Sequence, residues 1–183
     1  MLRILKETDE KFPFEWANID SYRDSKAYRK EIYLKKQDRI IDDLISLFYY
    51  LFGNHVSNIV VFDKSWWDYC LDTWNFEKDE YDYSLEDKSI ETQDYLSLLI
   101  ESQIQSNYSG CCSCSNWKKF LKITLNCLMS HKAPYSPIFC DKKNDYFFYF
   151  HESGSIGIYY KDEKNLAIEQ ILLKSYQSYI VEN

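Results

Sequence analysis

The chain has 183 residues, 45% of them apolar and 18% aromatic, which excludes a disordered chain and suffices for one domain with a hydrophobic core. Only four residues are glycine, and neither GxGxxG nor a P-loop motif is present, which argues against a nucleotide-phosphate loop. The net charge of −7 argues against nucleic acid and against an anionic membrane surface as direct ligands.

The first half of the chain is predicted to be mainly helical. Residues 1–19 form an irregular lead-in that carries Phe12, Phe14 and Trp16. A helical pattern follows over residues 20–52, with a break possible near 33–37 because thirty residues is long for one globular helix. The expected order beyond Gly53 is a strand at 58–62, a helix opening at Asp63 or Ser65, an acidic loop at 77–88 and a helix at 89–107.

The second half changes from helix to strand. Residues 108–116 are predicted to be a loop, followed by a helix over 117–131 that the prolines of APYSP end. Aromatic and β-branched runs then predict a three-stranded antiparallel meander whose middle strand is covered on both faces. The three runs are residues 137–141, 145–152 and 155–161, and a last helix over 165–177 and an edge strand over 178–182 follow them.

The predicted fold class is α+β, with N-terminal and central helices packed with a C-terminal antiparallel meander sheet and a final helix. We expect residues 1–183 to form a single domain. Within it, residues 1–107 are mainly helical and acidic, and residues 108–183 supply a helix, the meander and the last helix.

The negative charge is concentrated in the middle third. Residues 56–107 carry three basic and twelve acidic side chains, a net charge of −9, whereas the segments on either side are nearly balanced. The run EKDEYDYSLED, residues 77–87, holds six carboxylates, one lysine and two tyrosines. It is either a solvated turn or a surface for a basic protein partner, because charge of this kind steers association. The candidate partner-binding residues here are Asp79, Glu80, Tyr81, Asp82, Tyr83, Glu86 and Asp87.

The aromatic group Trp66, Trp67, Tyr69 and Trp74 has two interpretations. It belongs to the core, or it forms a binding patch, since tryptophan and tyrosine are enriched at interface hot spots. On the second interpretation Trp66 and Trp67 join the partner-binding residues, and the sequence leaves both interpretations open.

Cysteine and histidine residues offer an alternative chemistry. The cluster CCSC has adjacent and i+2 spacing, unlike a zinc knuckle, and its possible fourth ligands Cys127, His131 and Cys140 are scattered. A thiol enzyme could use His131 or His151, but no spacing selects a pair. The run HESGSIG, residues 151–157, resembles a site loop because it joins a histidine, a carboxylate, a serine and two glycines, but a glycine-containing hairpin turn explains it as well. We therefore predict no catalytic residue, no metal and no cofactor, with a thiol- or zinc-dependent enzyme as the alternative.

Four runs near the end of the chain carry a resemblance to a known family. They are GCCSCSNWKKFLKITLNC, HKAPYSPIF, FFYFHESGSIGIYYKDEKN and AIEQILLKSYQSYIVE. Together, over roughly residues 108–181, they resemble bacterial immunity proteins, the small cytoplasmic antidotes encoded beside polymorphic toxins, including those of contact-dependent growth inhibition systems. The resemblance implies a protein that is not an enzyme and that binds the C-terminal toxic domain of its partner. It transfers no catalytic residues and does not fix the binding surface.

Charge and resemblance together predict an immunity protein that neutralises a cognate toxin domain, with a basic nuclease as the expected partner, through an acidic aromatic surface. An acidic DNA-mimic inhibitor of a host enzyme is the alternative with the same charge pattern. The longest apolar run, LISLFYYLF, is too short for a bilayer, and no signal peptide is evident. We therefore expect a cytoplasmic protein without direct nucleic-acid or membrane contacts, whose six cysteines are free thiols.

Overall fold

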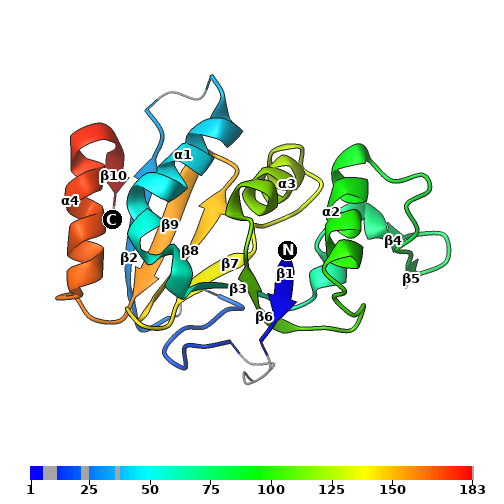
Figure 1. Ribbon diagram of the computed structural model, residues 1–183, viewed down its shortest axis with the longest axis horizontal. Coiled ribbons are helices and arrows are strands. Elements are labelled where there is room, and N and C mark those ends of the chain that lie inside the picture. Colours follow the sequence, from blue (N-terminus) through cyan, green and yellow to red (C-terminus); the bar gives the residue numbers. More distant parts are fainter. Residues whose placement is uncertain (6–11, 22–24, 36–37, 183) are drawn as a thin grey trace.

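The computed structural model describes residues 1–5, 12–21, 25–35 and 38–182 (Figure 1). The fold is α+β, as predicted, and centres on an eight-stranded sheet in the order β1-β6-β3-β7-β8-β9-β2-β10, with antiparallel pairing throughout. A small hairpin, β4-β5, is separate from it. The strands are β1 (Leu2–Ile4), β2 (Tyr28–Tyr33), β3 (Ile59–Asp63), β4 (Trp74–Asn75), β5 (Glu80–Tyr81), β6 (Gly110–Cys114), β7 (Ile138–Asp141), β8 (Tyr146–His151), β9 (Ser155–Tyr160) and β10 (Ile180–Glu182).

Among the described residues, α1 and α3 lie over one face of the sheet, with α4 beside α1 and α2 beside α3 at the two ends (Figure 1). The rings of Phe52 on α1 and Phe148 on β8 stack 4.0 Å apart in the centre of this layer, and Phe139 on β7 stacks on Phe148 at 4.9 Å. None of the helices, within the ranges that the structure describes, has the length and apolar character needed to cross a bilayer. The helices are α1 (Ile40–Phe52), α2 (Ile90–Glu101), α3 (Trp117–Met129) and α4 (Leu166–Ser178).

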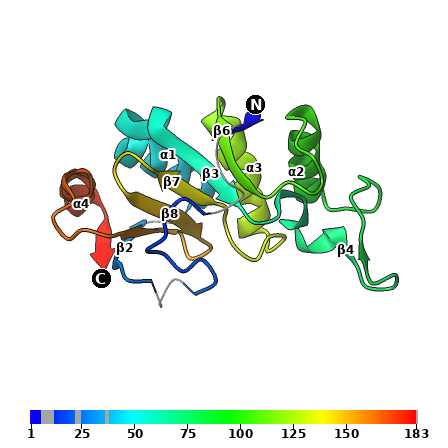
Figure 2. The same cartoon turned by 90° about the horizontal axis from the view of Figure 1, so that it is seen from below.

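The N-terminal segment covers the opposite face of the sheet (Figure 2). Phe12, Phe14 and Trp16 pack on Phe147 of β8, with ring centroids 5.3 to 6.2 Å apart. Because both faces are covered, β8 is buried at most positions, as the middle strand of the meander was predicted to be.

Most local predictions are confirmed. The strand near 58–62, the helices after Ser89 and Asn116, the three-stranded meander, the last helix and the edge strand are all present. The side chain of Asn116 accepts a hydrogen bond from the Lys119 amide, and Asn165 accepts from Ala167 and Ile168, which satisfies free amides at each helix start.

Several predictions are wrong, and the sheet explains those that concern strands. Residues 2–4, expected to belong to an irregular lead-in, form β1, which pairs with β6. Residues 28–33, expected to be helical, form β2, which pairs with β9 and β10; positions 22–24 and 36–37 of the expected helix lie outside the described residues. Residues 110–114, expected to be a loop, form β6 between β1 and β3. The segment after Ser65 is two short 3-10 turns, η3 (Trp66–Asp68) and η4 (Leu71–Thr73), instead of one helix. Long-range pairing determines the three strand segments, and the local periodicity of the sequence does not predict such pairing.

Candidate partner-binding site

The predicted acidic loop lies at the end of the molecule opposite α4 (Figures 1 and 2). We call residues 71–90 the acidic lobe. It begins at η4, turns back through the β4-β5 hairpin and ends at the first residue of α2. In the hairpin Trp74 pairs with Tyr81 and Asn75 with Glu80, so the carboxylates at its tip are carried on ordered backbone.

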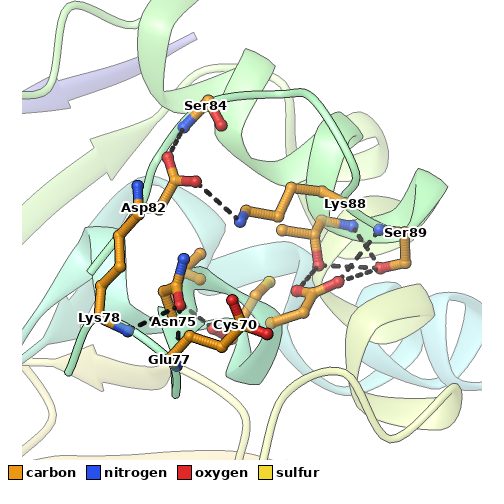
Figure 3. Close-up of polar contacts among 11 residues, drawn as sticks. Cys70, Asn75, Glu77, Lys78, Asp82, Ser84, Lys88 and Ser89 are labelled. Atoms are coloured by element: carbon orange, nitrogen blue, oxygen red, sulfur yellow. Dashed lines mark hydrogen bonds and ion pairs between the residues drawn. The ribbon is translucent and has the colours of Figure 1, made fainter. Parts of the chain in front are cut away.

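The hairpin turn is closed by the Asn75 side chain. Its Oδ1 accepts hydrogen bonds from the amides of Glu77 at 3.0 Å and Lys78 at 3.1 Å (Figure 3). Asp79 has a φ of 54°, a left-handed conformation that aspartate tolerates better than most residues. The turn sequence thus supplies its own hydrogen bonds.

Asp82 organises the second half of the lobe (Figure 3). Its Oδ1 accepts from the Ser84 amide at 2.9 Å, and its Oδ2 lies 3.6 Å from Nζ of Lys88, whose side chain is 8% exposed. The Ser84 hydrogen bonds, helped by Lys88, lower the pKa of Asp82. Asp82 is therefore held by its own lobe and is less available to a partner than its neighbours.

Asp72 joins the lobe to α2. Its Oδ2 accepts from the amide of Ser89 at 3.1 Å and from its hydroxyl at 2.8 Å, and its Oδ1 accepts from the Thr92 hydroxyl. Burial alone would raise the pKa of Asp72, but the hydrogen bonds from Thr92 and Ser89 outweigh it and lower that pKa. The Ser89 hydroxyl also caps α2 by accepting from the Thr92 amide.

Tyr83 fixes the lobe to the core. Its hydroxyl donates to Oδ1 of Asp68 at 2.6 Å, and its ring lies 5.2 Å from that of Trp67 in an edge-to-face arrangement. Tyr81 stacks at 6.0 Å from Tyr83 and meets Trp74 at 4.8 Å. These four rings form the aromatic base of the acidic lobe.

Trp66 and Trp67 belong to the core, which corrects their assignment to a partner-binding surface. Trp66 is fully buried, and its indole donates to the Gly110 carbonyl at 3.0 Å. Trp67 is 9% exposed, and its indole donates to the Ile104 carbonyl at 3.1 Å. Both support the lobe from below, and Tyr69 is fully buried beside them.

The remaining predicted residues stay at the surface. Asp79, Glu80, Tyr81, Glu86 and Asp87 are exposed, and Asp82 and Tyr83 are half-buried. The structure brings these residues together in the acidic lobe.

The lobe also exposes apolar side chains. Phe76, at the tip of the hairpin, is 87% exposed, the largest exposed fraction among the large apolar side chains of the described residues. Sequence reasoning missed Phe76, although its place between Asn75 and Glu77 in a polar turn was a signal. Other exposed apolar residues of the lobe are Leu71, Leu85 and Ile90.

The cysteine cluster does not converge on one point. Neighbours on a strand face opposite sides, so Cys111 packs with the N-terminal segment and Cys112 with the helices. Burial raises the pKa of Cys111 to about 11, of Cys112 to about 12 and of Cys114 to about 11, which disfavours reactive thiolates. The described residues contain no group of three or more His, Cys, Asp or Glu side chains placed to hold a metal ion.

The two candidate histidines are exposed, His131 in a turn and His151 at the end of β8. Nδ1 of His131 is 3.2 Å from Oε2 of Glu152, and both side chains are more than half exposed. Nδ1 of His151 accepts from the Ser153 amide at 3.1 Å, as expected of the glycine-containing turn that Gly154 closes with a φ of 80°. Within the described ranges, the hydrogen bonds of the two rings go to Glu152 and Ser153 and not to a cysteine.

Neither a scan against protein-family models nor searches of curated proteins and of solved structures find a match to this chain.

Proposed function

We propose that the protein is a cytoplasmic immunity protein that neutralises a cognate toxin domain by binding it through the acidic lobe. The observation that carries the proposal is the ordered β4-β5 hairpin, which presents exposed Phe76 among Glu77, Asp79 and Glu80 at one end of the molecule. An aromatic anchor beside several carboxylates suits a basic, partly apolar cleft, such as that of a nuclease that binds a phosphate backbone.

The rigidity of the lobe supports the same proposal. Hydrogen bonds that the Asn75 and Asp72 side chains accept, and one that the Tyr83 hydroxyl donates, order the lobe before any partner arrives. A surface ordered in advance loses less conformational entropy on association, which favours tight complexes burying about 1,600 Å² in total. We propose further that the chain acts by binding alone.

Binding to the expected toxin tests the proposal. The assay is co-expression with the product of the adjacent gene, scored by cell survival and by recovery of a stable complex. The double variant E77K/E80K reverses two exposed charges of the lobe and should abolish protection. E163K/E169K makes the same change in charge near α4, at the other end of the molecule, and should retain it.

Equal protection by both double variants would remove the acidic lobe from the proposal. A complex that forms with a host DNA-binding enzyme and not with the adjacent gene product would favour the DNA-mimic inhibitor instead, which uses the same surface chemistry.

A further inference from the structure

A cavity of about 230 Å³ lies at the end of β3, where it meets the loop before β7. Asp63 and Lys64 line one side, Tyr135 and Ser136 line another, and Asp20 of the N-terminal segment contributes to the wall. Since one water molecule occupies about 30 Å³ in the liquid, the space admits several waters or the end of one long side chain.

Asp63 is the unusual group in this wall. The residue is 3% exposed, and its Oδ1 accepts a hydrogen bond from the Ser65 amide at 2.9 Å. Its Oδ2 is buried and has no hydrogen-bond partner among the described residues. A buried polar atom without a partner costs free energy and is rare in folded proteins, so its presence calls for a functional explanation.

No cation compensates Asp63 in the described parts of the chain. The Lys64 ammonium pairs with Asp20. The titratable groups whose charge interacts with Asp63 are one acid and four groups that are neutral at pH 7, namely Asp68, Tyr69, Tyr95, Cys112 and Tyr135. Burial, with a smaller contribution from Asp68, raises the pKa of Asp63 to about 6, although backbone hydrogen bonds from Ser65 and Lys64 act to lower it. The carboxylate is thus mainly ionised at pH 7.5 and has no partner of opposite charge.

The cavity is connected to the acidic lobe through hydrogen bonds. The Ser65 amide binds Asp63, the Ser65 hydroxyl donates to Oδ2 of Asp68, and Oδ1 of Asp68 accepts from Tyr83 at 2.6 Å. Tyr135, in the cavity wall, is close enough to Tyr81 for its pKa to be raised in part by that residue. A partner seated on the aromatic base of the lobe would therefore lie beside this cavity.

We infer that the cavity at Asp63 is an anchor site for a guanidinium group, supplied by an arginine of the basic partner. The inference rests on the proposed function only in taking the guanidinium from an arginine of the partner protein. A guanidinium in the cavity supplies the positive charge that Asp63 lacks, and it is less strongly hydrated than an ammonium. The Tyr135 ring adds an aromatic wall, which favours a flat cation.

The protein alone tests the inference, with methylguanidinium as the probe and methylurea, its neutral analogue, as the control. At pH 7.5 and constant ionic strength, methylguanidinium should cause saturable amide shifts at residues 63–65, 135, 136 and 138 in ¹⁵N-correlated NMR spectra. Methylurea should cause none. Asp63→Asn keeps the acceptor for the Ser65 amide and removes the charge, so it should weaken binding at least tenfold. Glu163→Gln, at an exposed carboxylate outside the cavity, should change it less than twofold.

The pH dependence of the wild-type protein provides a second readout that needs no variant. Protonation of Asp63 removes the attraction, so affinity for methylguanidinium should fall about tenfold between pH 7.5 and pH 5. Absence of saturable shifts at residues 63–65, equal binding of methylurea, full binding by Asp63→Asn or a flat pH profile would each overturn the inference. Because no toxin is present in this experiment, a negative result would not contradict the proposed function, which the co-expression assay tests separately.

Discussion

The Tyr83 hydroxyl donates a 2.6 Å hydrogen bond to Oδ1 of Asp68, and this contact joins the acidic lobe to the 3-10 turn η3. Burial and the bond to Asp68 raise the pKa of Tyr83, so the phenol remains protonated and a donor at neutral pH. The Tyr83 side chain thus attaches the part of the lobe that follows the hairpin to Asp68.

Tyr83→Phe keeps the ring contact with Trp67 and removes only the hydroxyl. We expect a loss of about 1–2 kcal/mol in the free energy of unfolding, since a hydrogen bond to a charged acceptor is lost, together with faster amide hydrogen exchange over residues 77–88. Urea unfolding and exchange measured by mass spectrometry check both. Tyr176→Phe, at a side chain that is 59% exposed, is the matched control and should leave both unchanged.

Asp63→Asn should stabilise the protein at neutral pH. The folded-state pKa of about 6 lies above the ordinary value of 3.8, so the folded chain holds the proton more tightly than the unfolded chain. The free energy of unfolding of the wild type therefore falls as pH rises from about 4 to about 6, and it remains lower above that range. The variant should be more stable by about 1–3 kcal/mol at pH 7.5, and the difference should vanish near pH 3.5.

Chemical unfolding at the two pH values measures that difference. Asp20→Asn serves as the control at an exposed carboxylate and should change stability by less than about 0.5 kcal/mol. A wild type that is more stable than Asp63→Asn at pH 7.5 would mean that Asp63 has a partner in the folded state.

Phe76→Ala separates binding from stability. The ring is 87% exposed, so its removal should change the free energy of unfolding by less than about 0.5 kcal/mol. If Phe76 is an interface anchor, affinity for the toxin domain should fall by about 2 kcal/mol or more, chiefly through faster dissociation. Leu173→Ala, at a residue that is 66% exposed on α4, should leave affinity unchanged in calorimetry. Equal affinities for the wild type and Phe76→Ala would exclude the hairpin tip from the interface.

The thiols should react slowly in the folded protein. Cys114 is half-buried and the other five cysteines are buried, with thiol pKa values raised by burial at Cys111, Cys112, Cys114 and Cys140. Iodoacetamide at pH 8 should modify Cys114 first and the others only after unfolding, as peptide mass spectrometry can follow. Rapid alkylation of Cys111 or Cys112 would instead support the thiol-enzyme alternative.

Segments with a local signal were predictable, and segments that depend on distant partners were not. Periodicity and turn residues predict the capped helix after Asn116 and the meander from Ile138 to Tyr160. The strand β2 has no such local signal, because its strand conformation depends on pairing with β9, where Tyr28 lies opposite Tyr160. The short cysteine strand β6 lacks any local strand signal, and its neighbours β1 and β3 define it.

The candidate site was predictable in its charge and not in its geometry. Composition alone located the carboxylates around Glu80 and Asp82. It could not separate buried Trp66 and Trp67 from exposed Phe76, since all three are aromatic residues within eleven positions of one another. Nor could it find the cavity at Asp63, whose walls come from three separate parts of the chain.

The position of β2 between β9 and β10 has a consequence for synthesis on the ribosome. Tyr28 is synthesised long before Tyr160, with which it pairs, and Glu31 long before its partner Glu182. Until then the nascent N-terminal segment has no neighbour for its hydrogen-bonding edges, and such distant pairing slows folding. The growing chain should therefore depend on chaperones until translation is nearly finished, and fragments that stop before Ser155 should aggregate.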